Sequence, residues 1–245
     1  MLPGMPGYST LRQLGTAFEA RHHEDSFVRT VVELGYALPV PVSDTVLHSL
    51  GQKHHYVSIR HVAEHVLQIY PQKLLAGCTL AEKESFHTEM ESFWDAYRHH
   101  NPHHDVFSRF GKMLRRCIPM KIHADEGTGL RRSAVMQLSW GPCVSHSPSS
   151  IDRYFYFTCM ACENYKDFHR GYEAGNLVLD ELCAVMAAEA RDLYLEGFTA
   201  PGNRDRLHMV FHCFRRRPAC AGPNSAFGSA LRLSAEPALS MVSRK

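Results

Sequence analysis

Residues 118–140 read IPMKIHADEGTGLRRSAVMQLSW, and this stretch decides the fold. An apolar run at 118–124 is followed by Asp125 and Glu126, a glycine-rich turn and a second apolar run at 133–140. Two such runs around a glycine-containing turn predict a pair of antiparallel strands. Two interpretations of the turn stay open. The acids can bind a divalent metal or a substrate hydroxyl there, or Asp125 caps backbone amides while glycine supplies a positive φ.

The sequence after this hairpin predicts a crossover connection. Residues 152–159 contain four consecutive aromatic side chains and predict a third strand. Residues 165–196 form the longest helical pattern in the chain, and residues 207–214 read as a fourth strand. A helix that joins two strands of one sheet makes a right-handed crossover. We therefore expect the fourth strand to lie beside the first.

The residues before this domain predict a mainly helical region. Two prolines force residues 36–42 into an extended conformation. Three helices are then expected, beginning after Ser43, Ser58 and Thr79. The first of these ends near residue 50, and the last follows the capping-box sequence TLAE and carries an aromatic stripe over residues 86–97.

These patterns predict an α+β protein in three parts. Residues 1–105 form a helical N-terminal region, and residues 106–214 form a mixed sheet with one long helix. Residues 215–245 are rich in alanine, serine, glycine and proline, with almost no aromatic side chains, and we expect a disordered tail there.

Composition excludes several classes of protein. The chain has 245 residues and a net charge of +2, so it lacks the global basic character typical of an obligate nucleic-acid binder. Eight cysteines are too few for a disulfide scaffold in a chain of this length. The start has no signal-peptide pattern and no apolar run is long enough to span a membrane. We expect an intracellular protein, cytoplasmic or nuclear, with no membrane partner.

The predicted order of three strands, a helix and a fourth strand is the opening half of the ribonuclease-H-like fold, which transposases and integrases of the DDE kind share. In that fold an acid of the first strand meets two further acids, and together they hold two divalent metals for phosphoryl transfer. Asp125 matches the first position, with Glu126 beside it. The second position fails, because residues 212–217 read HCFRRR and contain no acid.

Several short motifs of this region also resemble a large uncharacterised family expanded in dinoflagellate genomes, whose members look like remnants of mobile elements. The resemblance covers about residues 80–214. The motifs that carry it are RCIP (116–119), HADEGTG (123–129), RRSAV (131–135), SWGP (139–142), SIDRY (150–154) and GYEAGN (171–176). The family has no established activity, and the Gly-Asp that the resemblance implies after the fourth strand is missing here.

Three further groups of residues are candidates for a site. His61, Glu64 and His65 spell H-x-x-E-H, in which two histidines one helical turn apart bind zinc and the glutamate polarises water. In a chain with seventeen histidines, stray histidines on a helix surface are the competing interpretation. Cys159 and Cys162 form a C-x-x-C, which we interpret as two buried thiols at a strand end rather than a redox or zinc pair.

The third group consists of two arginine pairs that flank the hairpin. These are Arg115, Arg116, Arg131 and Arg132. Arginine pairs can contact nucleic-acid phosphates, and they can also be part of a solvated face.

The sequence thus favours a transposase-derived domain without complete catalytic acids, acting as an interaction module for nucleic acid or protein, with no cofactor. The first alternative is a divalent-metal nuclease that uses Asp125 and Glu126 with Mg²⁺. The second is a zinc hydrolase that uses the H-x-x-E-H residues.

Overall fold

A computed structural model describes residues 40–128, 134–146, 153–168, 175–199 and 205–212, with a few residues before position 40. The chain divides into two compact units, Met1–Val40 and Pro41–Lys245. In the first unit the described residues 29–31 are helical. The tail predicted at residues 215–245 lies outside the described residues.

A mixed five-stranded sheet forms the centre of the second unit, with strand order β5-β4-β3-β7-β6. The strands are β3 (Cys117–Thr128), β4 (Ala134–Pro142), β5 (Phe155–Ala161), β6 (Phe198–Thr199) and β7 (Arg206–His212). β3 pairs antiparallel with β4 and parallel with β7. The prediction that the fourth strand lies beside the first is therefore confirmed, as is the α+β class.

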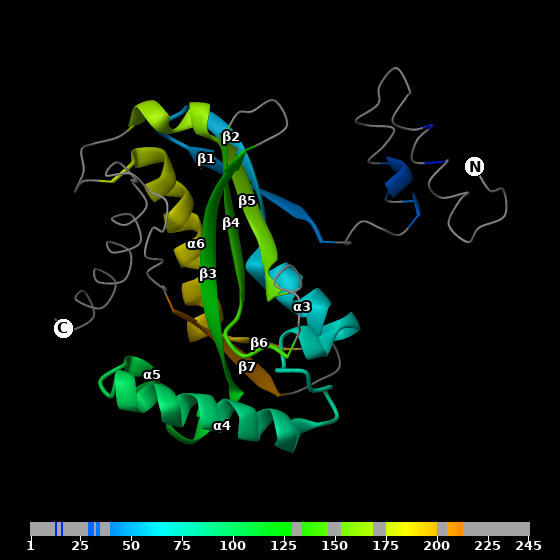
Figure 1. The fold of residues 1–245 in the computed structure, drawn as a ribbon, viewed down its shortest axis with the longest axis vertical. Helices are drawn as coiled ribbons and strands as arrows, with labels where there is room; N and C mark the ends of the chain where they lie inside the picture. Colours follow the sequence, from blue (N-terminus) through cyan, green and yellow to red (C-terminus); the bar gives the residue numbers. More distant parts are fainter. Residues whose placement is uncertain are drawn as a thin grey trace. The chain divides into compact units, whose positions relative to one another are not determined.

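Helix α6 (Leu177–Leu195) is the crossover between β5 and β7. It returns along the sheet to the end at which β7 begins (Figure 1). The helix was expected from residue 165, but Asn176 is its N-cap, because the Asn176 side-chain oxygen accepts hydrogen bonds from the backbone N–H groups of Val178 and Leu179. The described start of the predicted helical segment contains one short 3₁₀ turn instead, η5 (Lys166–Phe168), and another, η4 (Cys162–Asn164), comes just before it.

Residues 42–57 form a β-hairpin, which corrects the helix predicted after Ser43. β1 (Val42–Leu47) pairs antiparallel with β2 (Gln52–Val57), and Gly51 takes a positive φ of 62° in the connecting turn. The sequence of β1 alternates between exposed and less exposed residues and contains three β-branched side chains, a pattern that suits a strand. The preference of Ser43 for a helix cap was therefore outweighed by the alternation that follows it.

Helix α3 (Ile59–Ile69) follows the hairpin and is joined to α6 through a carboxylate. Ser58 is its N-cap residue, as predicted, but the cap hydrogen bonds come from elsewhere. Glu189 of α6 accepts from the Ile59 N–H at 2.6 Å and from the Ser58 hydroxyl at 3.1 Å. Glu181 of α6 similarly accepts from the backbone N–H of Ser49 in the hairpin turn at 3.1 Å.

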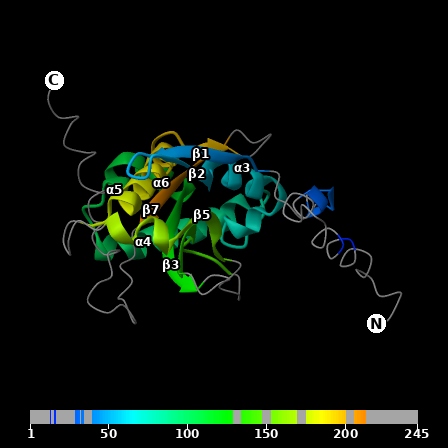
Figure 2. The ribbon, with the colours of Figure 1, turned by 90° about the horizontal axis from the view of Figure 1, so that it is seen from above.

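The remaining helices cover the end of the sheet at which β3 begins (Figure 1). They are η1 (Pro71–Lys73), α4 (Lys83–His100), α5 (Asp105–Phe110) and η2 (Gly111–Arg116). The buried Trp94 of α4 donates its indole N–H to the Cys117 carbonyl at 2.8 Å. Figures 1 and 2 place α5 near the end of α6, where the Tyr194 hydroxyl donates to Asp105 at 2.7 Å.

Candidate functional site

Asp125 and Glu126 lie inside β3 and not at its end. The predicted strand stopped at residue 124, whereas β3 continues to Thr128, with Asp125 paired to Gln137 and Glu126 paired to Met136. Successive side chains of a strand point to opposite faces of the sheet. The two carboxylates therefore lie on opposite faces, and they cannot act as a pair of ligands at the mouth of a turn.

Glu126 has a neighbour on its own face. The hydroxyl of Tyr165 donates a hydrogen bond to Glu126 Oε1 at 2.7 Å. The Tyr165 side chain is buried, and burial together with the hydrogen bond to the Glu126 carboxylate raises the tyrosine pKa well above its usual range. Glu126 thus ties β3 to the segment between β5 and α6.

Asp125 lies on the part of β3 that continues past the end of β7, its parallel partner. The last residue of β7, His212, is opposite Lys121, so Asp125 lies about 13 Å further along the strand. Within the described residues, no three His, Cys, Asp or Glu side chains come together in a way that could hold a metal ion.

The H-x-x-E-H residues lie on α3 as predicted. His61 is exposed, and Glu64 and His65 are half-buried. Glu64 Oε1 is 3.9 Å from the guanidinium of Arg60, its neighbour one turn earlier on the helix. In the part of the chain that the structure describes, these three side chains do not form a metal-holding group.

Cys159 and Cys162 are not both buried, which corrects the interpretation of the C-x-x-C. Cys159 is exposed on β5, and Cys162 begins η4; both are free thiols. The two residues between them are extended, which separates the two Cα atoms by roughly 10 Å. A disulfide needs Cα atoms within about 7 Å, so this pair cannot close without a movement of the backbone.

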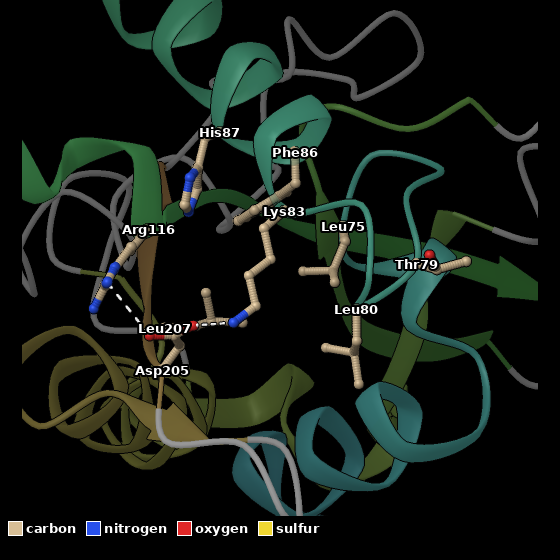
Figure 3. A pocket seen from close by; sticks show the side chains of 9 residues that line it. All are labelled: Leu75, Thr79, Leu80, Lys83, Phe86, His87, Arg116, Asp205 and Leu207. Carbon is tan, nitrogen blue, oxygen red and sulfur yellow. Dashed lines mark hydrogen bonds and ion pairs between the residues drawn. The ribbon is translucent and has the colours of Figure 1, made fainter.

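One hollow of the described structure lies at the start of β3 and β7, and it contains Arg116 (Figure 3). Apolar side chains and three basic groups line it, and one carboxylate joins them. The lining residues are Leu75, Thr79, Leu80, Lys83, Phe86, His87, Arg116, Asp205 and Leu207. The hollow has about 370 Å³ of empty space, part of it open to solvent.

Asp205 bridges two of the cations in this basic hollow. Its Oδ2 is 2.6 Å from Lys83 Nζ, and its Oδ1 is 3.3 Å from Arg116 Nη2. The hydrogen bond from Lys83 and the charges of Lys83 and Arg116 lower the Asp205 pKa. The bridge joins the first turn of α4, the end of η2 and the residue before β7, which are far apart in the sequence.

His87 contributes a third basic group to the basic hollow. Its Nδ1 is buried and has no hydrogen-bond partner in the described structure; the nearest carboxylate, Glu84, is 3.9 Å away. Burial and the charge of Arg115 lower the His87 pKa, which favours the neutral imidazole. The sequence offered no signal for Lys83, His87 and Asp205 as a group, because 122 residues separate Lys83 from Asp205.

The arginine pairs predicted to contact nucleic acid have different positions. Arg115 is exposed and Arg116 half-buried at the end of η2. Arg116 is nine residues before Asp125, so the pair lies roughly 30 Å from that carboxylate along β3. Arg131 and Arg132 lie outside the described residues.

No known protein family matches the chain, no curated protein matches it in sequence, and no solved structure matches its fold. The helices among the described residues do not include one with the length and apolar character needed to cross a membrane.

Proposed function

We propose that this chain is a ribonuclease-H-like domain, derived from a transposase, that binds nucleic acid without cleaving it. The strand order and the crossover helix support the fold part of the proposal. The position of Asp125 supports the other part of the proposal, that the domain does not cleave nucleic acid. β7 ends four positions short of it, and residues 213–217 contain no acid that could face it. A two-metal site needs several carboxylates around one point, and among the described residues no three His, Cys, Asp or Glu side chains come together in that way.

The exposed cations of η2 support nucleic acid as the partner. Lys112 and Arg115 are both exposed on this short segment, and Arg116 follows with its guanidinium partly occupied by Asp205. Lysine and arginine side chains of this kind neutralise phosphates and release counterions, which gives salt-dependent and sequence-independent binding. The small net charge of the chain implies a local contact rather than a wide basic surface.

Fluorescence anisotropy with labelled DNA and RNA tests the proposal. Affinity should fall when salt is raised from about 50 mM to about 200 mM, by roughly three-fold for each contacted phosphate. The double variant Lys112→Ala/Arg115→Ala should lower the slope of log affinity against log salt by about 1 to 2. Lys53→Ala removes an exposed cation from β2 and is the matched control. Absence of binding to every nucleic acid tested would overturn the proposal.

A divalent-metal nuclease is the second candidate, and one observation favours it. Asp125 is exposed on the carboxyl half of β3. In open α/β sheets, ligands bind at the carboxyl ends of the parallel strands. The nuclease hypothesis predicts Mg²⁺- or Mn²⁺-dependent cleavage that Asp125→Asn abolishes and Glu126→Gln leaves intact. We expect no cleavage by the wild-type chain with either metal.

A further inference from the structure

The polar face of β3, β4 and β5 brings together side chains that are suited to unpaired bases. Cross-strand partners share a face, and residues two apart on a strand do so as well. The register pairs His123 with Ser139 and Ser139 with Tyr156, and it pairs Asp125 with Gln137. These residues therefore lie on one face, together with Lys121.

Tyr154 reaches the same face because the chain crosses the sheet at a glycine. A Cβ on Gly141, which is paired with Lys121, would lie 1.9 Å from the carbonyl oxygen of Arg153. Only glycine allows the backbone of residues 153–154 to pass this close. The crossing places the Tyr154 ring 4.8 Å from the His123 ring, and Lys121 Nζ lies 4.9 Å from the Tyr154 ring centroid.

The other face of these strands is the hydrophobic core. Trp140, paired with Ile122, is fully buried and packs on Phe155 with ring centroids 4.8 Å apart. Tyr156 differs from these aromatic residues, because 44% of it is exposed. Its direct partner Ser139 is buried, but Gln137, further along β4, and Asp125, opposite Gln137 on β3, are exposed. An exposed tyrosine among polar neighbours contributes little to the core, and its ring is available to a partner.

We propose that this tyrosine face, defined by Lys121, His123, Gln137, Tyr154 and Tyr156, binds single-stranded nucleic acid by stacking a base on Tyr156. The proposal rests on the nucleic-acid-binding function above; it adds a base-contacting surface to the phosphate-contacting cations of η2 and names the substrate class. Aromatic side chains on a sheet stack unpaired bases whatever their sequence. The Gln137 amide can bond base edges, and Lys121 can neutralise a phosphate.

The charge of the tyrosine face favours base contacts over phosphate contacts. Lys121 is a cation, and His123 is an imidazole, but the carboxylate of Asp125 lies at the rim of the face and repels phosphate. A duplex presents mainly phosphates, and its bases are already stacked on one another. Asp125→Asn should therefore bind single strands more tightly than the wild type, by about two- to five-fold at low salt.

The test uses the full chain and a labelled single strand of about 12 nucleotides, which fits the size of common single-strand sites. Tyr156→Ala should weaken binding by roughly 5- to 100-fold, whereas Tyr156→Phe, which keeps the ring, should stay within about two-fold. Tyr70→Ala is the matched control, because Tyr70 is 62% exposed beyond the end of α3. Circular dichroism checks that each variant folds.

The outcomes separate the two proposals. If the wild type binds single strands and Tyr156→Ala binds them equally well, the tyrosine face is not the contact surface, and the nucleic-acid-binding function remains. If the matching duplex binds as tightly as the single strand, stacking is wrong as the mode of binding. If the wild type binds neither nucleic acid, both proposals fall. In a second readout, the fluorescence of Tyr156→Trp should be quenched by the single strand; an unchanged spectrum during binding would contradict the proposal.

Discussion

The side-chain amide of Asn176 donates a hydrogen bond to the carbonyl oxygen of Tyr165 at 2.6 Å. Its oxygen accepts from the first backbone N–H groups of α6, so one fully buried side chain both starts the helix and holds the 3₁₀ segment before it. Asn176 is the last residue of the GYEAGN motif, so this part of the motif has a structural role. Gly175, just before the cap, takes a positive φ of 74°. Tyr165 in turn reaches Glu126 of β3.

Asn176→Ala should lower the free energy of unfolding by about 2–3 kcal/mol, because it removes a helix cap and leaves the buried Tyr165 carbonyl without its donor. Asn176→Ser keeps an oxygen for the cap and loses the amide donor. Urea denaturation should therefore place Asn176→Ser between the wild type and Asn176→Ala in stability. Equal stability of all three proteins would contradict this account.

Glu189→Gln should destabilise the chain by about 1–2 kcal/mol, since the charged carboxylate that accepts from the first N–H of α3 is replaced by a neutral amide. Glu196→Gln is the matched control, because the Glu196 side chain is 71% exposed and its closest cation is 3.5 Å away. Thermal unfolding followed by circular dichroism measures both. A melting temperature of Glu189→Gln as high as that of the control would show that the cap contributes nothing.

Gly141→Ala should unfold the protein or cost about 3 kcal/mol or more, because its new methyl group meets the backbone oxygen of Arg153. Gly127→Ala is a direct comparison on the neighbouring strand, where a Cβ has no atom within 4 Å. Gly127→Ala should change stability by less than about 0.5 kcal/mol. Soluble expression and urea titration distinguish the two variants.

His212 should make the protein less stable in acid. Burial lowers its pKa from 6.5 to about 4, so between these values the unfolded chain binds a proton that the folded chain does not. The contribution of neutral His212 to the free energy of unfolding is therefore fully present above pH 6.5. It is lost progressively as the pH falls toward 4, and the total loss is on the order of 3 kcal/mol. His212→Phe keeps an aromatic ring and should lose less stability than the wild type between pH 7 and pH 4.5. If the two proteins lose equal stability over this pH range, His212 is not the source of the acid sensitivity.

The sheet and its crossover helix could be predicted because their signals are local. Apolar and aromatic runs marked β3, β4, β5 and β7, and the apolar face of α6 marked the helix. The hairpin β1–β2 was missed because a serine before a short apolar run is equally typical of a helix cap. No local pattern could reveal the basic hollow, since it depends on residues 122 positions apart that become neighbours only when β7 lies beside β3.

The predictions about chemistry depended on side-chain direction, which a motif alone does not give. Asp125 and Glu126 are adjacent in sequence, but the alternation along β3 separates them onto two faces once the strand is known to continue to Thr128. The two cysteines of the C-x-x-C are similarly separated by extended backbone. The exposed Tyr156 lies in an aromatic run that predicts only a strand, and its outward direction follows from the register with β4.

The two carboxylates of α6 that hold the hairpin and α3 also fix the length of that helix. Glu181 reaches Ser49, and Glu189 reaches Ile59, eight residues apart on one continuous helix. One residue inserted between them would rotate Glu189 by about 100° and move it about 1.5 Å along the axis. An insertion or deletion between residues 181 and 189 therefore breaks at least one of the two contacts, which makes this spacing a fixed distance between the hairpin turn and the start of α3.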